Sequence, residues 1–222
     1  MKRKTKTKTA RQATKKKISR PKEPKIGKYM GLEYESFCEL SCLFFAEELM
    51  KQGYVDRIER SPSYSLCDPV QHSYAEQLKR GSKQVTQTIS QGVTYTPDFD
   101  IYFTSKALGK FCWDMNSGKK WEKHLLVAQY VAYHPTLIDV NPLYKACCEV
   151  KPDFSRASTT PKSVQSMKWL MQKHGVFVNL FRPNRIFQGL FTPAKYLITE
   201  RGTIRLLKFK PLTLQEYLKK KI

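Results

Sequence analysis

Two stretches of the chain repeat apolar residues at helical spacing and carry polar residues that suit helix ends. In the first stretch, Ser36 and Glu39 have the spacing of a capping box, and Gly53 suits the C-terminal stop. The second helix is predicted over residues 161–174, with Thr160 as its cap and Gly175 as its stop. A short basic helix is predicted over residues 213–221. The apolar positions of the first helix are Phe37, Leu40, Leu43, Phe44, Ala46 and Leu49.

Alternating or continuous apolar runs between these helices predict strands. Residues 54–66 indicate two short strands or one bent edge strand, because Ser61-Pro62 interrupts them. The pattern of residues 121–133 fits a helix or a strand. Further strands are predicted over residues 85–89, 93–103, 143–151 and 176–181, and a hairpin over residues 195–209 around Arg201-Gly202. This order of elements predicts an α/β fold with a central mixed β-sheet flanked by helices.

The length of 222 residues (25.9 kDa) suits one domain with extensions. We expect a disordered basic tail over residues 1–28 and a core over residues 29–182. The core carries insertions at about 68–92 and 104–141, and residues 183–222 add the C-terminal hairpin and short helix to it.

Charge is concentrated at the N-terminus. Residues 1–28 hold 13 Lys or Arg and one acid, which is more than half of the net charge of +21. A segment with so little to bury should be disordered alone, and its charges suit a sequence-independent grip on phosphates. A solubility tail and an address signal are the alternatives. The residues expected to bind nucleic acid here are Lys2, Arg3, Lys4, Lys15, Lys16 and Lys17.

The six cysteines lack the spacing of a disulfide scaffold, and no N-terminal apolar run resembles a signal peptide. We therefore expect an intracellular protein with free thiols. A zinc site is not supported by the cysteine and histidine spacings, and buried thiols are the simpler interpretation. No apolar run of 18 residues exists, so no membrane span is predicted.

A candidate for phosphodiester chemistry is the pair Pro97-Asp98, which is followed by Glu149-Val150-Lys151. If residues 146–151 form a strand, the side chains of Glu149 and Lys151 leave one face while Val150 points into the core. Carboxylates on adjacent strands can hold Mg²⁺, and Lys151 could activate water or offset charge on the phosphate. The alternative is a solvated strand face on which Glu and Lys simply alternate.

With these motifs the chain resembles the PD-(D/E)xK nuclease superfamily over residues 31–182, and within it the TnsA-type transposon-end endonucleases and small phage nucleases or resolvases. The resemblance implies a restriction-endonuclease-like core and a Mg²⁺-dependent endonuclease, for which Mn²⁺ could substitute. It implies metal binding by Asp98, Glu149, the Val150 carbonyl and Glu39, and catalysis by Glu39, Asp98, Glu149 and Lys151.

DNA is the partner that the resemblance implies, together with other phage or transposition proteins, and it leaves a homodimer open. It implies a setting in the cytoplasm of a prokaryotic or phage-infected cell, or in a virion. Arg156, Lys162 and Lys168 follow the ExK strand and could steer DNA toward the site, although solvated lysines are the default on a helix face.

Two features depart from the family pattern. The separation of Asp98 and Glu149 is long, so residues 104–141 form an insertion or another acid, Asp100 or Asp139, replaces Asp98. Glu39 also has a capping role that needs no metal, in which its side chain bonds the Ser36 amide. The competing function is a non-enzymatic basic nucleic-acid-binding or virion-associated packing protein with a nuclease-like fold. Convergence of Glu39, Asp98 and Glu149 within metal-bridging distance would favour the enzyme, and their dispersal would favour the binding protein, because unneutralised carboxylates repel phosphates.

Overall fold

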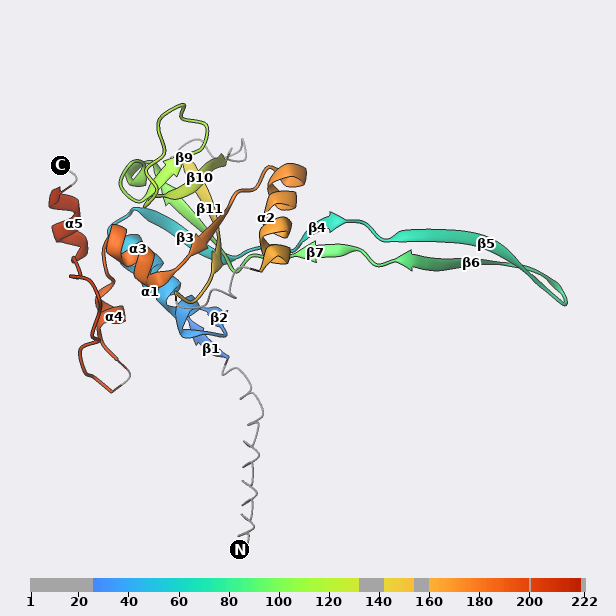
Figure 1. Ribbon diagram of the computed structural model, residues 1–222, viewed down its shortest axis with the longest axis horizontal. Helices are drawn as coiled ribbons and strands as arrows, with labels where there is room; N and C mark the ends of the chain where they lie inside the picture. Colours follow the sequence, from blue (N-terminus) through green and yellow to red (C-terminus); the bar gives the residue numbers. More distant parts are fainter. Residues whose placement is uncertain (1–25, 132–141, 154–159, 200, 221–222) are drawn as a thin grey trace, which may run out of the picture.

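The computed structural model describes residues 26–131, 142–153, 160–199 and 201–220. It confirms an α/β fold built on a mixed central sheet (Figure 1). Five strands lie side by side in this sheet, and a sixth, β12 (Val178–Phe181), also pairs with β11. In spatial order the five are β3 (Val55–Arg60), β8 (Phe99–Thr104), β11 (Leu143–Val150), β10 (Leu126–Val131) and β9 (Cys112–Asp114).

The central strand β11 has two neighbours along one edge. Its first half pairs antiparallel with β10 and its second half pairs parallel with β12. Asn179 joins the two at this fork. Its side-chain amide donates to the carbonyls of Val127 and Cys147, at 2.8 and 3.0 Å, and its oxygen accepts from the Val127 amide at 2.8 Å. The side chain of Asn179 thereby hydrogen-bonds the backbone groups of Val127 and Cys147 at the fork, where β10 and β12 diverge.

One face of the sheet packs against α1 (Phe37–Lys51). Alternate residues of β8 and β11 point to this face, as the period of two requires. They meet α1 in an aromatic core, where Phe45 lies 5.6 Å from Phe181 and 5.2 Å from Phe191 between ring centroids. The residues supplied by the two central strands are Phe99, Ile101, Phe103, Ala146, Cys148 and Val150.

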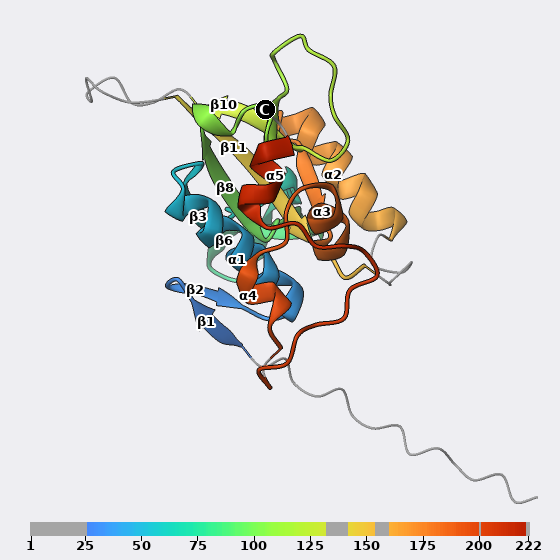
Figure 2. The same cartoon turned by 90° about the vertical axis from the view of Figure 1, so that its left-hand side faces the viewer.

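The other face carries α2 (Pro161–His174), which is labelled in Figures 1 and 2, and the strand pair β4 (Tyr64–Cys67) and β7 (Val93–Tyr95), which is labelled in Figure 1. Side chains from these elements form a smaller apolar cluster with Cys147 and Val178 of the sheet. The predicted ends of α2 are confirmed, since Thr160 caps the Ser163 amide at 3.2 Å and Gly175 adopts a left-handed φ of 67°.

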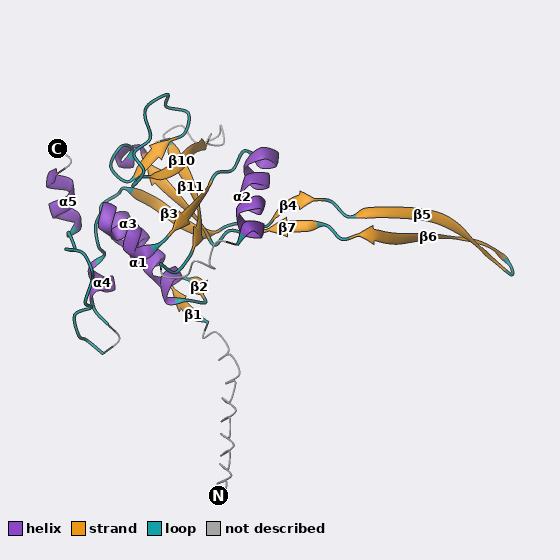
Figure 3. Ribbon diagram, viewed as in Figure 1, coloured by secondary structure: helices purple, strands orange, loops and turns teal. Residues whose placement is uncertain are grey.

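The predicted insertion at 68–92 is a long two-stranded hairpin, β5 (Val70–Leu78) and β6 (Gly81–Ser90), which projects from the body (Figure 3). It continues the pair β4 and β7 outward. All of its strand residues are exposed apart from Val85, which is partly buried. The other predicted insertion, 104–141, contributes β9 and β10 to the central sheet, together with the short 3-10 helix η1 (Ser105–Ala107).

The two ends of the described chain pack around α1. A hairpin of β1 (Gly27–Tyr29) and β2 (Leu32–Tyr34) precedes it, so regular structure begins inside the range expected for the tail. The C-terminal part contains three short helices, α3 (Pro183–Gly189), α4 (Ala194–Leu197) and α5 (Leu214–Lys220).

The hairpin predicted over 195–209 is present in a shorter form around Arg201-Gly202. Ile198 and Ile204 form an antiparallel bridge, the Thr199 amide donates to the Thr203 carbonyl at 2.9 Å and the Arg205 amide to the Leu197 carbonyl at 2.7 Å, while α4 takes the first predicted positions. None of the helices in the described residues is both long and apolar enough to cross a membrane.

Candidate functional site

Asp98 lies where β8 begins beside the end of β11. Pro97 separates β7 from β8, so the strand predicted over 93–103 is broken at this point. The Asp98 amide donates to the Cys148 carbonyl at 3.0 Å, and the Val150 amide donates to Asp98 Oδ2 at 2.6 Å. The carboxylate therefore occupies the position of the next backbone acceptor in the ladder between the two strands.

Glu149 and Lys151 leave β11 on the same side, as predicted from their spacing. Lys151 Nζ lies 2.5 Å from Glu149 Oε1, and the Tyr95 hydroxyl donates to Glu149 Oε2 at 3.0 Å. The side chain of Val150 lies in the core with α1, which confirms its predicted direction. Glu149 is 7% exposed, so its charge depends on these two partners rather than on water.

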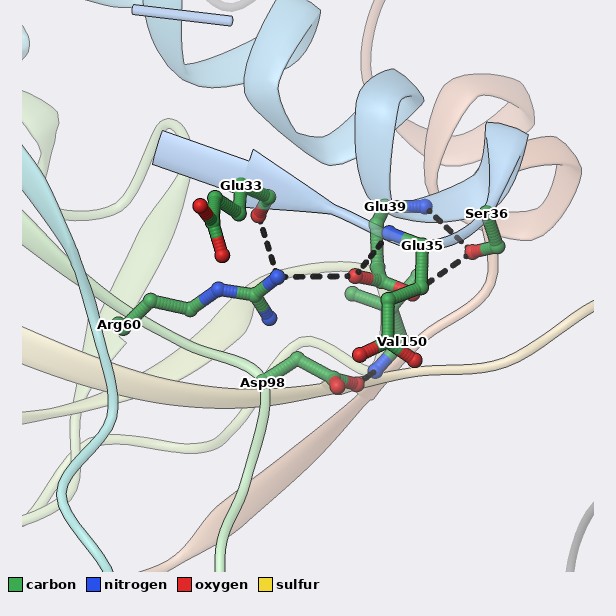
Figure 4. Close-up of polar contacts among 7 residues, drawn as sticks. All are labelled: Glu33, Glu35, Ser36, Glu39, Arg60, Asp98 and Val150. Carbon is green, nitrogen blue, oxygen red and sulfur yellow. Dashed lines mark hydrogen bonds and ion pairs between the residues drawn. The ribbon is translucent and has the colours of Figure 1, made fainter. Parts of the chain in front are cut away.

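Glu39 lies in the first turn of α1 and is also buried. Its amide donates to Ser36 Oγ at 3.2 Å, and the Ser36 hydroxyl donates to Glu39 Oε1 at 2.9 Å (Figure 4). The capping prediction is correct except for one partner: Glu39 Oε2 accepts from the Glu35 amide, at 3.1 Å, rather than from the Ser36 amide. Arg60 Nη2 lies 3.3 Å from the same oxygen.

Glu149 and Glu39 both lie near enough to Asp98 for their charges to act on it. Glu39 approaches from the side of α1, to which Val150 also points, and Figure 4 draws it with Asp98 and Val150. The pKa of Asp98 is raised to about 6, chiefly by burial; the Val150 amide and Lys151 oppose the rise, and the charges of Glu149 and Glu39 add to it. Burial also raises the pKa of the Cys42 thiol well above its usual value, with Asp98 and Glu39 adding to the effect. The site is thus a half-buried concentration of negative charge.

The carboxylates suit Mg²⁺ in chemistry, since it prefers hard oxygen ligands and is often bound through one or two carboxylates while keeping several waters. Asp98 and Glu149, at the adjoining ends of β8 and β11, can supply such a pair. A preformed cluster of three or more His, Cys, Asp or Glu side chains able to hold a metal is not present in the described residues. Each of the three acids is instead held by donors of the protein itself.

Asp100, the alternative to Asp98, is 2% exposed and bound elsewhere on the same face. Its Oδ1 accepts from Ser61 Oγ at 2.7 Å, and its Oδ2 lies 3.4 Å from Lys145 Nζ. Cys147 is its partner across the ladder with β11. These contacts account for its charge within the fold, whereas Asp98 has Glu149 and Glu39 as neighbours.

The residues predicted to contact DNA are not joined to the three acids by any ion pair within the described residues. Lys162 and Lys168 are exposed on α2. Asp139, Arg156 and the six basic residues predicted in the tail lie outside the described residues.

Two partners of the acids, Tyr95 and Arg60, were not predicted from the sequence. Tyr95 stands in the run 94–98 that carries the motif, so its nearness to Pro97-Asp98 was a usable signal. Arg60 ends the edge strand β3 and reaches Glu39 only through the packing of α1 on the sheet, which no local pattern encodes.

Comparison of the chain with models of known protein families, with curated proteins and with solved structures finds no match.

Proposed function

We propose that the protein is a Mg²⁺-dependent DNA endonuclease of the PD-(D/E)xK type, with Mn²⁺ as a substitute metal and a restriction-endonuclease-like core. The observation that carries the proposal is the meeting of Asp98, Glu149 and Lys151 at the adjoining ends of two antiparallel strands, with Glu39 near Asp98 on the side of α1. These are the residues onto which the motif carries the family roles. Cleavage of transposon or phage DNA ends, or of branched DNA, is the corresponding process.

Asp98, Glu149 and the Val150 carbonyl would hold the metal, with Glu39 acting directly or through water. When bound, the metal would polarise the phosphate and lower the pKa of a bound water. Tyr95 fixes one oxygen of Glu149 and so orients that carboxylate. The Lys151 ammonium now neutralises Glu149; released toward substrate, it would orient the attacking water or stabilise charge on the phosphate.

The raised pKa of Asp98 supports this assignment. Ionisation of acids that lie close together in the folded protein is unfavourable, so a divalent cation that binds them and neutralises their charge stabilises the fold. A fold that needed only hydrogen bonds at this position could use an amide instead of an acid. Perturbed acids are enriched at functional sites for this reason.

The direct test is incubation of the purified chain with linear, nicked and branched DNA in Mg²⁺, Mn²⁺ or EDTA. Cleavage should require metal and should be lost in Asp98→Asn and Glu149→Gln. Glu59→Gln is the matched control. Glu59 is an exposed acid on the neighbouring strand β3, and its replacement removes the same charge as each site variant. Loss of activity with retained DNA binding is expected for the site variants only. Full activity in Glu149→Gln would refute the proposal.

A second candidate is a non-enzymatic nucleic-acid-binding or virion-associated protein on the same fold. The observation favouring it is that Glu39, Asp98 and Glu149 already have protein donors, as in a purely structural network. Binding of DNA without cleavage in either metal, together with a melting temperature that Mg²⁺ does not raise, would support this function over the nuclease.

A further inference from the structure

The projecting hairpin of β5 and β6, here called the arm, buries neither face. Antiparallel sheets in folded domains normally pack one face on a core, and an isolated two-stranded hairpin is marginally stable in water. Its strands contain 9 and 10 residues, which at about 3.3 Å per residue gives a length of roughly 30 Å. An ordered element of this length without a core calls for a partner that covers it.

The two faces of the arm differ in chemistry. Residues directly opposite each other across the ladder share a face. One face carries only amides, hydroxyls and one alanine, and its Ser73 and Thr86 hydroxyls are hydrogen-bonded at 3.0 Å. Its residue pairs are Gln71 with Thr88, Ser73 with Thr86, Ala75 with Gln84, and Gln77 with Ser82.

This uncharged face matches the edges of base pairs. Gln can pair with adenine through two hydrogen bonds, Ser and Thr bond to any base, and Ala or the Thr methyl contacts the thymine methyl. The opposite face carries His72, Tyr74, Glu76 and Leu78 and lacks this pattern. A two-stranded ribbon fits the major groove, which is about 12 Å wide.

The tip of the arm is basic. Lys79 and Arg80 form its turn, and Lys83 stands opposite Glu76, the one acid of the strands. No ion pair in the described residues involves Lys79 or Arg80. Two unneutralised cations at the end of this uncharged face suit phosphates at the groove rim, because phosphate contacts position a protein while base contacts specify sequence.

The base of the arm reaches the candidate site. The strands of the arm continue into β4 and β7, in which Tyr64 pairs with Tyr95, and Tyr95 bonds Glu149. Counting 15 residues from Tyr95 to Arg80 at about 3.3 Å each puts the tip about 50 Å along the strands from Tyr95, or roughly 15 base pairs of duplex. The arm is therefore placed to contact the same duplex about one and a half helical turns from the acids.

We propose that the arm enters the major groove of duplex DNA, with its amide and hydroxyl face toward the base edges and Lys79 and Arg80 on phosphates. The choice of DNA rests on the proposed function, which this inference deepens by assigning a duplex-reading, specificity-determining element.

The tip is tested with Lys79→Gln/Arg80→Gln against Lys219→Gln/Lys220→Gln. The second pair removes the same charge from α5, which lies at the other end of the molecule (Figure 1). Binding to a 30-base-pair duplex is measured in EDTA by fluorescence anisotropy, from 50 to 200 mM salt. The salt slope is the change of log affinity with log salt concentration, and the tip variant should make it shallower by about 1.8, for two lost phosphate contacts. Between 50 and 200 mM salt, the affinity of the tip variant should therefore fall about 12-fold less than that of the wild type. The α5 variant should keep the wild-type slope.

The polar face is tested with Gln84→Ala against Gln87→Ala, which removes the same side chain from the opposite face of the same strand. On a duplex selected from a random pool by the wild-type protein, Gln84→Ala should weaken binding about tenfold with an unchanged salt slope, and replacement of the contacted adenine by 7-deazaadenine should weaken binding of the wild type but not of Gln84→Ala. The dimethyl sulfate footprint of the wild type should cover major-groove guanine N7 positions. Gln87→Ala should bind as the wild type does. Circular dichroism should show that all four variants are folded.

Three results would overturn the inference: a wild-type salt slope in the tip variant, equal effects of Gln84→Ala and Gln87→Ala, or protection of minor-groove positions alone. Excision of residues 70–90, joining β4 to β7 by a short turn, gives an independent outcome. If excision dissociates a dimer and leaves DNA binding intact, the arm is a self-association surface and the inference fails. Because binding is measured in EDTA, these results are separate from a failure to find cleavage, which would refute only the nuclease.

Discussion

Replacement of Glu39 by glutamine separates the two roles that this residue can have. Glu39 accepts hydrogen bonds from the Ser36 hydroxyl and the Glu35 amide and pairs with Arg60. Glutamine keeps one acceptor oxygen, so Glu39→Gln retains part of the cap and removes the charge. The Arg60 side chain is 37% exposed, so the lost ion pair is worth about 1 kcal/mol at most.

For a domain of this size that loss corresponds to a fall in melting temperature of roughly 2–4 °C. If Glu39 assists metal binding, Mg²⁺-dependent cleavage should fall by more than about tenfold, equivalent to about 1.4 kcal/mol in the barrier. Cleavage is measured under single-turnover conditions at saturating enzyme, well below the melting temperature. The small change in stability cannot account for such a loss of rate.

Ser36→Ala is the control, because it removes the hydroxyl that accepts from the Glu39 amide and donates to Glu39 Oε1, but it keeps the charge of the carboxylate and its contacts with the Glu35 amide and Arg60. It should lower stability by about 1 kcal/mol, the usual cost of losing a cap, and should retain activity. Wild-type activity in Glu39→Gln, or equal losses of rate in both variants, would refute a metal role and leave Glu39 as a helix cap.

Three further predictions follow from the same contacts. Tyr95→Phe removes the hydroxyl that holds Glu149; cleavage should slow several-fold and the apparent affinity for Mg²⁺ should weaken, and an unchanged metal titration would contradict the orienting role. The pKa of Asp98 rises from 3.8 to about 6 on folding, so its contribution to metal-free stability is complete below pH 4 and is lost as the pH rises through 6, by about 3 kcal/mol at most. Urea unfolding in EDTA should show this pH dependence reduced in Asp98→Asn, and an equal dependence in both proteins would argue against the shift. Deletion of residues 1–25, which ends before β1 begins at Gly27, should preserve the melting temperature and make the salt slope of DNA binding shallower by about 0.9 for each lost phosphate contact; an unchanged slope would assign the tail to another role.

The elements with explicit end signals could be predicted from the sequence. The cap Thr160, Pro161 at the first helical position and Gly175 at the stop fixed both ends of α2. Residues 183–189 form a helix that was not predicted, because Pro183 opens it after a strand and only seven residues follow before it ends. The hairpin expected around Arg201-Gly202 is shorter than predicted, since turn residues alone do not supply partners for long strands.

The candidate site could be predicted where its geometry is local. The alternation within β11 placed Glu149 and Lys151 on one side and Val150 in the core. The long separation between Asp98 and Glu149 was harder to interpret. After β8 the chain first forms β9 and β10, on the far side of the position of β11, and only then returns to form β11 next to β8. Sequence distance therefore said little about spatial distance, and β8 is the direct neighbour of β11.

The break at Pro97 links the proposed site and the arm. Because of the break, β7 ends at Tyr95 and β8 begins after Asp98. The Tyr95 hydroxyl bonds Glu149 from the base of the arm, and the Asp98 carboxylate accepts from the Val150 amide at the end of β11. A continuous strand would have carried Tyr95 and Asp98 on opposite faces, since they are an odd number of residues apart. Because proline removes the amide that a continuous ladder needs, it allows both residues to reach the end of β11. Any displacement of the arm by a bound duplex would reach Glu149 through the Tyr95 hydroxyl, which couples the occupancy of the arm to the orientation of a proposed metal ligand.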